Sequence, residues 1–418
     1  MKTFLVIAAL IAVATAAVFT KKAPLYGDGN GAKEGDYIVV FQKKLPESEV
    51  KKHLEKVAVF GKSVTVRHHF RLTSLVAYSA NIDDDALEEI RMMPEVRYVE
   101  RNGILHATGT KVEKACEEQP EVTWGLARIS KEDAYTPNDP YRYESDGIGE
   151  DVYIYIIDTG TRVGHVDYGG RAELGVDCYT SLDCIPATGF DANGHGTHVG
   201  STAAGTTYGV AKKATIYPVK VLSDGGSGSY EQVVAGVVYT TNEKRSNPSR
   251  KVVANMSLGG PASQLLDDAV NEAVDEGVHM VVAAGNEFQD ACLRSPARAN
   301  GVTTVGATDI DDQAAYFTNF GECVAIFAPG VNIIAASGAS DTATATYSGT
   351  SMASPHVAGV VASILSRCDD VPPADMEVFI KSIASKDKIG GLPPGYEHDN
   401  ELAYIGCETG CPTASKKN

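Results

Sequence analysis

From residue 152 to residue 366, short apolar runs alternate with longer segments of helical spacing, and no other feature of the chain restricts its fold as much. Strands separated by helices run parallel, because each helix returns the chain to the edge from which it started. Helices then cover both faces of the sheet. The expected strands are 152–157, 215–221, 251–257, 278–284, 302–307 and 324–328, and the expected helices are 230–242, 265–276 and 351–366.

The region before this sheet has a different pattern. The order β-α-β-β-α-β predicts a small ferredoxin-like α+β unit without a catalytic constellation of its own. Polar stretches at 26–35 and 107–121 have no clear period, so we expect linkers there, the second also a processing region. The expected strands of the unit are 36–41, 63–70, 74–80 and 96–99, and its expected helices are 47–60 and 83–92.

Residues 1–16 have the pattern of a secretory signal peptide. Lys2 is followed by the apolar run Phe4–Val13 and by the small residues Ala14–Ala16. A membrane anchor is the alternative, but the run is too short to span a bilayer. No later segment is long and apolar enough to cross a membrane, so we expect a secreted, extracellular protein.

Acidic residues are concentrated in the larger, C-terminal part of the chain. The whole chain carries 37 Lys+Arg and 54 Asp+Glu residues, a net charge of -17, yet residues 18–106 hold 14 basic and 13 acidic residues. A strongly acidic surface repels phosphate groups. This argues against nucleic acid and anionic membranes as partners.

All eight cysteines follow residue 110. In a secreted chain an even number indicates disulfides, although eight cysteines allow 105 pairings and the sequence alone does not choose among them. Zinc is an alternative at Cys407 and Cys411, but no second pair of ligands accompanies them.

Three glycine-bearing segments carry chemistry. A serine hydroxyl attacks when a base takes its proton, and an imidazole base needs a carboxylate that holds its tautomer and stabilises its cation. Taken singly, the aspartate could be a turn residue and the serine a helix cap. In chain order the segments are Asp158-Thr159-Gly160, His195-Gly196-Thr197-His198 and Gly349-Thr350-Ser351-Met352-Ala353-Ser354.

Together with Trp124–Ile129 and Asn193–His198, these segments resemble the subtilase family of serine proteases, most closely its proteinase K branch. The family shares the chain order Asp, His, Ser. The resemblance implies a subtilisin-like parallel sheet with helices on both faces. It also implies a signal peptide at 1–16, an inhibitory propeptide at 17–107 with its core at 36–106, and a peptidase domain at 108–418 with its core at about 120–405.

The resemblance also implies roles for single residues. Ser351 would be the nucleophile, His195 its base, and Asp158 the group that orients His195. Independently of the resemblance, we expect His198 to be structural, because a metal pair with His195 is disfavoured by the i, i+3 spacing and by the lack of an accompanying carboxylate motif. Asn286 would donate its side-chain amide to the oxyanion. Two segments would bind an extended substrate peptide by strand addition. The substrate-binding residues are Ser227, Gly228, Ser257, Leu258 and Gly259, with Ala284 and Gly285 at the pocket.

This pocket is apolar in the sequence and shows no carboxylate placed for a basic side chain. We therefore expect apolar or aromatic residues before the scissile bond (P1), and a protease specific for basic residues is disfavoured. The chemistry needs no cofactor. A structural calcium ion is one interpretation of Glu132-Asp133 with Asn138-Asp139, and a solvated acidic loop is the other. Ala325 stands where proteinase K has a calcium-ligand aspartate.

Two disulfides follow from the resemblance, Cys292–Cys323 and Cys407–Cys411, and elimination leaves Cys178–Cys184 and Cys116–Cys368 as guesses. His68 and His69 in the propeptide are either a pH sensor or ordinary strand residues.

The sequence thus predicts a monomeric, secreted serine endopeptidase of broad specificity that acts on proteins or peptides. It is made as a zymogen whose own propeptide is an intramolecular inhibitor. The propeptide would end in the active site near His106, with self-cleavage near Ala107 or Thr108. The alternative is a binding protein on a protease scaffold that keeps its propeptide and has little turnover.

Overall fold

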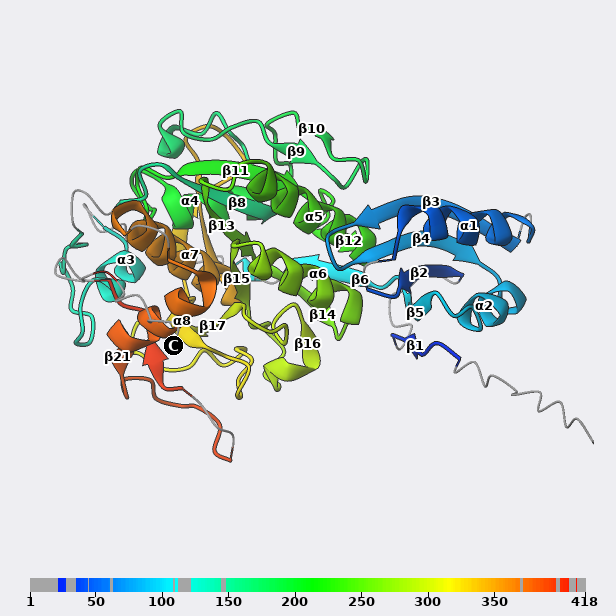
Figure 1. The fold of residues 1–418 in the computed structure, drawn as a ribbon. Helices are drawn as coiled ribbons and strands as arrows, with labels where there is room; N and C mark the ends of the chain where they lie inside the picture. The colour runs from blue at the N-terminus through cyan, green and yellow to red at the C-terminus, as the bar shows by residue number, and fades with distance from the viewer. Residues whose placement is uncertain are drawn as a thin grey trace, which may run out of the picture.

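A largely parallel ten-stranded sheet is the centre of the larger part of the molecule (Figure 1). The computed structural model describes residues 22–27, 35–43, 45–60, 63–107, 110–111, 122–143, 148–368, 371–395, 399–405 and 411. The strands, in their order across the sheet, are β10 (Ile185–Pro186), β9 (Val176–Asp177), β11 (Thr215–Lys220), β8 (Val152–Asp158), β13 (Lys251–Met256), β15 (His279–Ala283), β17 (Thr303–Thr308), β18 (Ile326–Pro329), β22 (Glu401–Leu402) and β21 (Ser385–Lys386). Neighbours from β9 to β22 run parallel, and only the two outermost strands are antiparallel.

Helices cover both faces of this sheet, as the alternating pattern predicts. The side chains of β8 point alternately to the two faces, so that Ile154 and Ile156 join one core and Tyr155 and Ile157 the other. The first core contains residues of α4 (His195–Ala204), α7 (Thr350–Arg367) and α8 (Pro373–Ile383). The second contains residues of α5 (Tyr230–Ser246) and α6 (Gln264–Asp275). A short helix, α3 (Trp124–Ile129), opens this part of the chain.

The strand order places a switch point at β8. The chain leaves β8 for β11 on one side and returns to β13 on the other side of β8. At such a point the carboxyl ends of adjacent strands open onto a crevice, where open α/β sheets bind their ligands. Asp158, the last residue of β8, lies at this edge.

The N-terminal part of the chain is the ferredoxin-like unit that the sequence predicts. Its strands β5 (Val96–Arg101), β2 (Asp36–Phe41), β4 (Val76–Ile82) and β3 (Val64–Arg71) form one antiparallel sheet in this order. The short strand β1 (Leu25–Tyr26) extends it beside β5 and was not expected. One face of the sheet forms a core with α1 (Glu47–Ala58) and α2 (Asp84–Arg91). The Asp83 carboxylate caps α2 by accepting from Ala86 N at 2.9 Å.

The opposite face of this small sheet packs on α5 and α6 (Figure 1). Ile38, Val40 and Phe70 belong to the same buried cluster as residues of these two helices. Polar contacts surround the apolar centre: Tyr98 Oη donates to Asp268 at 2.8 Å, and the Glu100 carboxylate accepts from Leu265 N at 2.8 Å. The N-terminal unit thus covers two helices of the larger part.

Three disulfides are present in the described part of the chain. Cys178–Cys184 and Cys292–Cys323 are the pairs expected for these cysteines. The predicted bridge Cys407–Cys411 is wrong, and so is Cys116–Cys368, because Cys368 is bonded to Cys411. Cys368 directly follows α7, and the chain after β22 returns to this helix end, so that the two Cα atoms lie 5.6 Å apart. A short spacing in sequence could not reveal this contact. Cys116 and Cys407, like residues 1–16, lie outside the described residues.

Two further strand groups complete the fold. Strands β19 (Ile333–Ala336), β20 (Thr344–Ser348) and β7 (Thr110–Lys111) form one sheet, and β12 (Ser227–Ser229), β6 (Ile104–Ala107), β14 (Leu258–Pro261) and β16 (Arg294–Ser295) form another. None of the helices in the described ranges is both long and apolar enough to cross a membrane.

Candidate active site

Asp158 and His195 meet at the switch point. Asp158 ends β8, and His195 is the first residue of α4. His195 Nδ1 donates to Asp158 Oδ1 at 2.8 Å, and Thr159 N donates to the same oxygen at 2.7 Å. Both side chains are buried. Because the proton of the imidazole lies on Nδ1, Nε2 is the nitrogen that can accept a proton.

Ser351 lies at the same edge of the sheet. In the parallel pair of β13 and β8, Asn255 is opposite Ile156, so Ser257 falls opposite Asp158. The Ser351 hydroxyl donates to Ser257 O at 3.1 Å, and Ser257 Oγ donates to Ser351 O at 2.8 Å. Ser351 is the second residue of α7, where the positive end of the helix dipole favours negative charge.

Asn286 is fixed through its side-chain oxygen. Asn286 Oδ1 accepts from Thr350 N at 2.8 Å and from Thr350 Oγ1 at 3.0 Å, and Gly285 N donates to Thr350 Oγ1 at 3.1 Å. Thr350 immediately precedes Ser351. These bonds hold the amide in one orientation, in which the oxygen faces the start of α7 and the NH₂ group remains as the donor.

Asn319 supports the loop that carries Asn286 through hydrogen bonds to its backbone. The sequence contains no indication of this role. Asn319 is fully buried, donates to Ala284 O at 2.9 Å and accepts from Glu287 N at 3.1 Å. Gly285 has a φ of +103°, and a Cβ atom there would lie 2.3 Å from Asn319 Nδ2. Only glycine fits this close approach without strain.

A carboxylate that the sequence analysis did not single out, that of Glu287, lies beside this loop. Glu287 Oε2 would be 2.7 Å from a Cβ atom at Gly285, and Asn319 Nδ2 donates to it at 2.8 Å. Its other oxygen accepts from Arg294 Nη2 at 2.9 Å. The charge of Glu287 is therefore matched by a guanidinium on β16.

The two predicted peptide-binding segments flank one strand of the chain itself. In the β12 pair, Ser227 is opposite His106 and Ser229 is opposite Ile104, whereas in the β14 pair Gly259 is opposite His106 and Leu258 is opposite Ala107. Both pairs are antiparallel. β6 thus occupies the position that strand addition would give to a substrate.

The next strand of the chain after β6, β7, pairs with β20, which directly precedes the start of α7. Ala107 is opposite Leu258, and Thr110 is opposite Ser348, three residues before Ser351. The bonds that join Ala107 to Thr110 thus connect the strand between the two binding segments to the strand that leads into α7.

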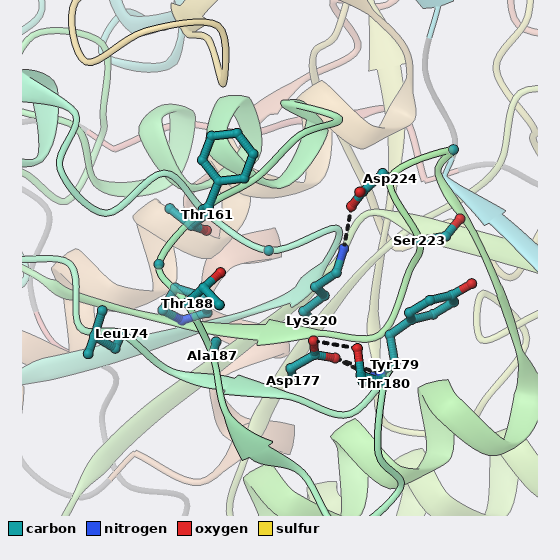
Figure 2. A pocket seen from close by; sticks show the side chains of 15 residues that line it. Thr161, Leu174, Asp177, Tyr179, Thr180, Ala187, Thr188, Lys220, Ser223 and Asp224 are labelled. Carbon is teal, nitrogen blue, oxygen red and sulfur yellow. Dashed lines mark hydrogen bonds and ion pairs between the residues drawn. The ribbon is translucent and has the colours of Figure 1, made fainter.

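A cavity of about 480 Å³ opens beside the Asp158–Gly160 turn (Figure 2). Lys220 lines it, and its Nζ donates to Thr159 O at 2.7 Å and to Asp224 Oδ1 at 3.2 Å. Asp224 belongs to the loop before β12, and Asp224 O accepts from Asn193 Nδ2 at 2.9 Å. The cavity therefore lies between the turn that carries Asp158 and the loop that leads to the binding segment.

Both aspartates proposed for calcium lie near lysine side chains. The Asp139 carboxylate accepts from Lys131 Nζ at 2.8 Å and from Thr136 N and Oγ1 at 2.7 Å, and these bonds lower the pKa of Asp139 to about 2. Asp133 lies 3.5 Å from Lys388 Nζ. Within the described ranges no three His, Cys, Asp or Glu side chains form a group that could hold a metal ion.

His198 is structural. Its Nε2 donates to Ile333 O at 3.0 Å, and its ring stacks on Tyr347 with the ring centroids 4.6 Å apart. Burial lowers the pKa of His198 to about 3, so the ring stays neutral at physiological pH.

A buried aspartate–histidine pair, a serine at a helix start and a clamped strand define the class of a serine peptidase. The Subtilase family model matches residues 149–400, and the Peptidase inhibitor I9 model matches residues 36–108. The chain belongs to the subtilase family of serine endopeptidases and carries an inhibitor-type propeptide.

Relatives and solved structures agree with this membership. A subtilisin-like protease of Coccidioides posadasii is 39% identical over 92% of this chain and 83% of its own length. The subtilisin-like serine protease Pen c 2 of Penicillium citrinum is 40% identical over 94% and 93%. A cold-adapted subtilisin-like serine proteinase has a TM-score of 0.62 at 40% identity, covering 68% of this chain and 98% of its own. Fervidolysin from Fervidobacterium pennivorans, a keratinolytic enzyme, has a TM-score of 0.70 at 23% identity over 92% of this chain and 62% of its own, which shows the fold alone.

Proposed function

We propose that this endopeptidase is a secreted, self-processing enzyme that cleaves peptide bonds through Asp158, His195 and Ser351. The observation that carries the proposal is the position of β6 between β12 and β14, because an inhibitor segment in the substrate's place fits a zymogen. The hydrogen bond from His195 Nδ1 to Asp158 supports the roles of base and orienting group.

In the proposed reaction the same groups act in both acylation and deacylation. His195 Nε2 takes the proton of Ser351 Oγ as this oxygen attacks the peptide carbonyl, and Asp158 stabilises the resulting imidazolium. The Asn286 amide and the N–H of Ser351 donate to the oxyanion. The imidazolium then gives its proton to the leaving amine, and water hydrolyses the acyl-enzyme by the reverse sequence of proton transfers.

Substrate selection is proposed to rest on the two edges and on the pocket beside them. Ser227, Gly228, Ser257, Leu258 and Gly259 would hydrogen-bond the substrate backbone, which reads no side chain, and Ala284 and Gly285 would line the P1 pocket. Pairing of Glu287 with Arg294 supports an apolar or aromatic P1 preference, since the carboxylate already has its cation. The cavity of Figure 2 would receive a neighbouring side chain of the substrate.

The signal peptide is proposed at residues 1–16, the propeptide at 17–107 and the peptidase domain at 108–418. The opposition of Ala107 to Leu258 and of Thr110 to Ser348 supports cleavage near Ala107 or Thr108. Catalysis needs no cofactor, as in other subtilases. We do not propose calcium at Asp133 and Asp139, because their carboxylates face lysine side chains.

The test compares the secreted products of the wild-type chain, Ser351→Ala and Ser354→Ala. Ser354 is a matched control, because it lies on α7 like Ser351 and its hydroxyl is also close to Ser257, 2.9 Å from Ser257 Oγ. We expect Ser351→Ala to keep its propeptide covalently attached, whereas the other two chains are cleaved near Ala107 or Thr108 and react with a fluorophosphonate probe. Normal maturation of Ser351→Ala would show that self-cleavage is wrong. A wild-type chain that is cleaved by another protease but does not react with the probe would favour the binding-protein alternative.

A further inference from the structure

A second buried aspartate connects the segments that carry Asp158 and His195. Asp191 is 1% exposed, and Asp191 Oδ1 accepts from Thr159 Oγ1 at 3.0 Å and from Gly194 N at 3.0 Å. Its Oδ2 accepts from Thr197 N at 3.0 Å and from Thr197 Oγ1 at 2.7 Å. One carboxylate thus binds the residue after Asp158 and both sides of His195.

These bonds belong to an unusual start of α4. The N-cap residue is Gly194, with a φ of 89°, which has no side chain to cap the helix. Three side chains from outside the helix cap its first N–H groups instead: Asn193 accepts from His195 N at 3.2 Å, Thr159 from Gly196 N at 2.9 Å, and Asp191 from Thr197 N. The helix start is therefore fixed to the turn after Asp158.

The turn after Asp158 and the start of α4 are in close contact. A Cβ atom at Gly196 would lie 2.1 Å from Gly160 O and 3.2 Å from Asp158 Oδ1. A shift of either segment would therefore change the hydrogen bond between His195 and Asp158. Thr159, which donates to Asp191 and accepts from Gly196 N, is the link that the carboxylate holds.

The charge of Asp191 matters as well as its bonds. No Lys, Arg or His side chain of the described residues forms an ion pair with it, so four hydrogen bonds alone balance a buried negative charge. His195 becomes a cation during acyl transfer at the N-terminus of α4, where the helix dipole opposes positive charge. A carboxylate at this helix end offsets that opposition.

We propose that Asp191 is a positioning residue for the Asp158–His195 pair, which it aligns through Thr159 while its charge stabilises the imidazolium form of His195. This inference rests on the proposed function, because it needs His195 to act as the base. It adds Asp191, a side chain that does not touch the substrate, to the residues of that function.

The test measures kcat and KM against pH for wild type, Asp191→Asn, Thr159→Val and Asp167→Asn. Each precursor is matured by a trace of tagged wild-type enzyme that is then removed, and active sites are titrated. Asp167 is the matched control: it is a buried aspartate at the other end of α4, where it accepts from Ser201 Oγ at 2.6 Å and from Thr207 N at 2.7 Å.

For Asp191→Asn we expect kcat to fall on the order of 10- to 100-fold with KM changed less than about twofold, and the acid limb of the profile to move to lower pH by about 0.5–1 unit. The limb moves down because the imidazolium loses a stabilising charge and gives up its proton more readily. Thr159→Val should lower kcat about tenfold and leave the limb in place, since the charge remains. Asp167→Asn should lower the melting temperature and leave both kcat and the acid limb unchanged.

Several results would overturn the inference. One is an Asp191→Asn enzyme whose kcat and acid limb are those of wild type. Another is an Asp191→Asn enzyme whose acid limb does not move and whose loss of kcat is also found in Asp167→Asn. If Asp191→Asn does not fold, Thr159→Val decides, and a wild-type kcat in that variant refutes the link. A wild-type enzyme without activity would instead refute the proposed function.

Discussion

Glu100 makes the contact between propeptide and peptidase depend on pH. It lies on β5, is 1% exposed, and accepts from Leu265 N at the start of α6. Burial raises the pKa of Glu100 to about 7, from an ordinary value of 4.5. After release the side chain returns to water and to its ordinary pKa. Propeptide binding is therefore linked to the protonation of this carboxyl group.

The sign and size of the linkage follow from these values. An acid whose pKa is raised in the complex stabilises the complex fully below its ordinary pKa and loses that contribution as the pH rises through the raised value. The difference of about 2.5 units, at about 1.4 kcal/mol per unit, gives about 3 kcal/mol. The dissociation constant should thus rise on the order of 100-fold between pH 4.5 and pH 8.

His68 acts in the opposite direction. It lies 3.8 Å from Asp183 of the peptidase, and burial lowers the pKa of His68 from its ordinary 6.5. A histidine with a lowered pKa loses its contribution to binding as the pH falls below 6.5, so protonation loosens the complex, which is the direction expected of a sensor. Between pH 6.5 and 8.5 these values give about a fourfold rise in the dissociation constant from Glu100 and at most about a twofold opposing change from His68, so the comparison with Glu100→Gln isolates Glu100.

The assay follows activity after dilution of the cleaved but still associated complex. Samples incubated between pH 6.5 and 8.5 are transferred to one fixed pH for a short activity measurement. Wild type should release active enzyme faster as the pH rises, and Glu100→Gln should lose most of this dependence because its side chain does not titrate. Glu88→Gln, a change on the exposed surface of α2 in the same unit, should behave like wild type. A wild-type release rate that does not rise with pH, or a Glu100→Gln complex with the wild-type slope, would refute the reasoning.

Three further predictions follow from the site and from the acidic loop. Asn286→Ala should lower kcat about 10²–10³-fold with little change in KM, because the amide acts on the oxyanion; a KM effect alone would contradict this role. Arg294→Gln removes the partner of Glu287 and should raise the relative kcat/KM for lysine at P1 severalfold in a peptide series; an unchanged series would place Glu287 outside the pocket. Asp139→Asn should lower the melting temperature by the same amount with and without a chelator, since the carboxylate binds Lys131 and Thr136; a loss confined to chelator-free buffer would restore the calcium interpretation.

The sequence predicted the features that depend on a few residues in fixed motifs or on a regular pattern. Asp158 could be placed because a buried apolar run ends at it, and the alternation of strands and helices predicted the sheet edge where it lies. The ferredoxin-like order of the N-terminal unit could be predicted for the same reason. In each case local spacing and burial favour the same structure.

Other features arise only when distant segments meet. The helix α4 was not predicted, because glycine and threonine are weak helix formers and its N–H groups are capped by Thr159, Asp191 and Asn193 from outside. Asn319 is 33 residues from Asn286 and holds its loop through backbone groups, which leave no signal in a sequence. The Cys368–Cys411 bridge likewise depends on where β22 returns the chain.

Glu287 shows why a pocket's charge is not a property of its residue types. The sequence places a glutamate directly after Asn286, which the sequence analysis did not count as a carboxylate placed for a basic side chain. The fold brings Arg294 of β16 to 2.9 Å from this carboxylate and Asn319 to 2.8 Å, so its acceptors already have donors. A basic substrate would have to displace the guanidinium and would gain only the difference between two ion pairs, which is small for partly exposed groups. The pairing of Glu287 with Arg294 therefore supports the proposed apolar preference, and this pairing could not be predicted from the sequence alone.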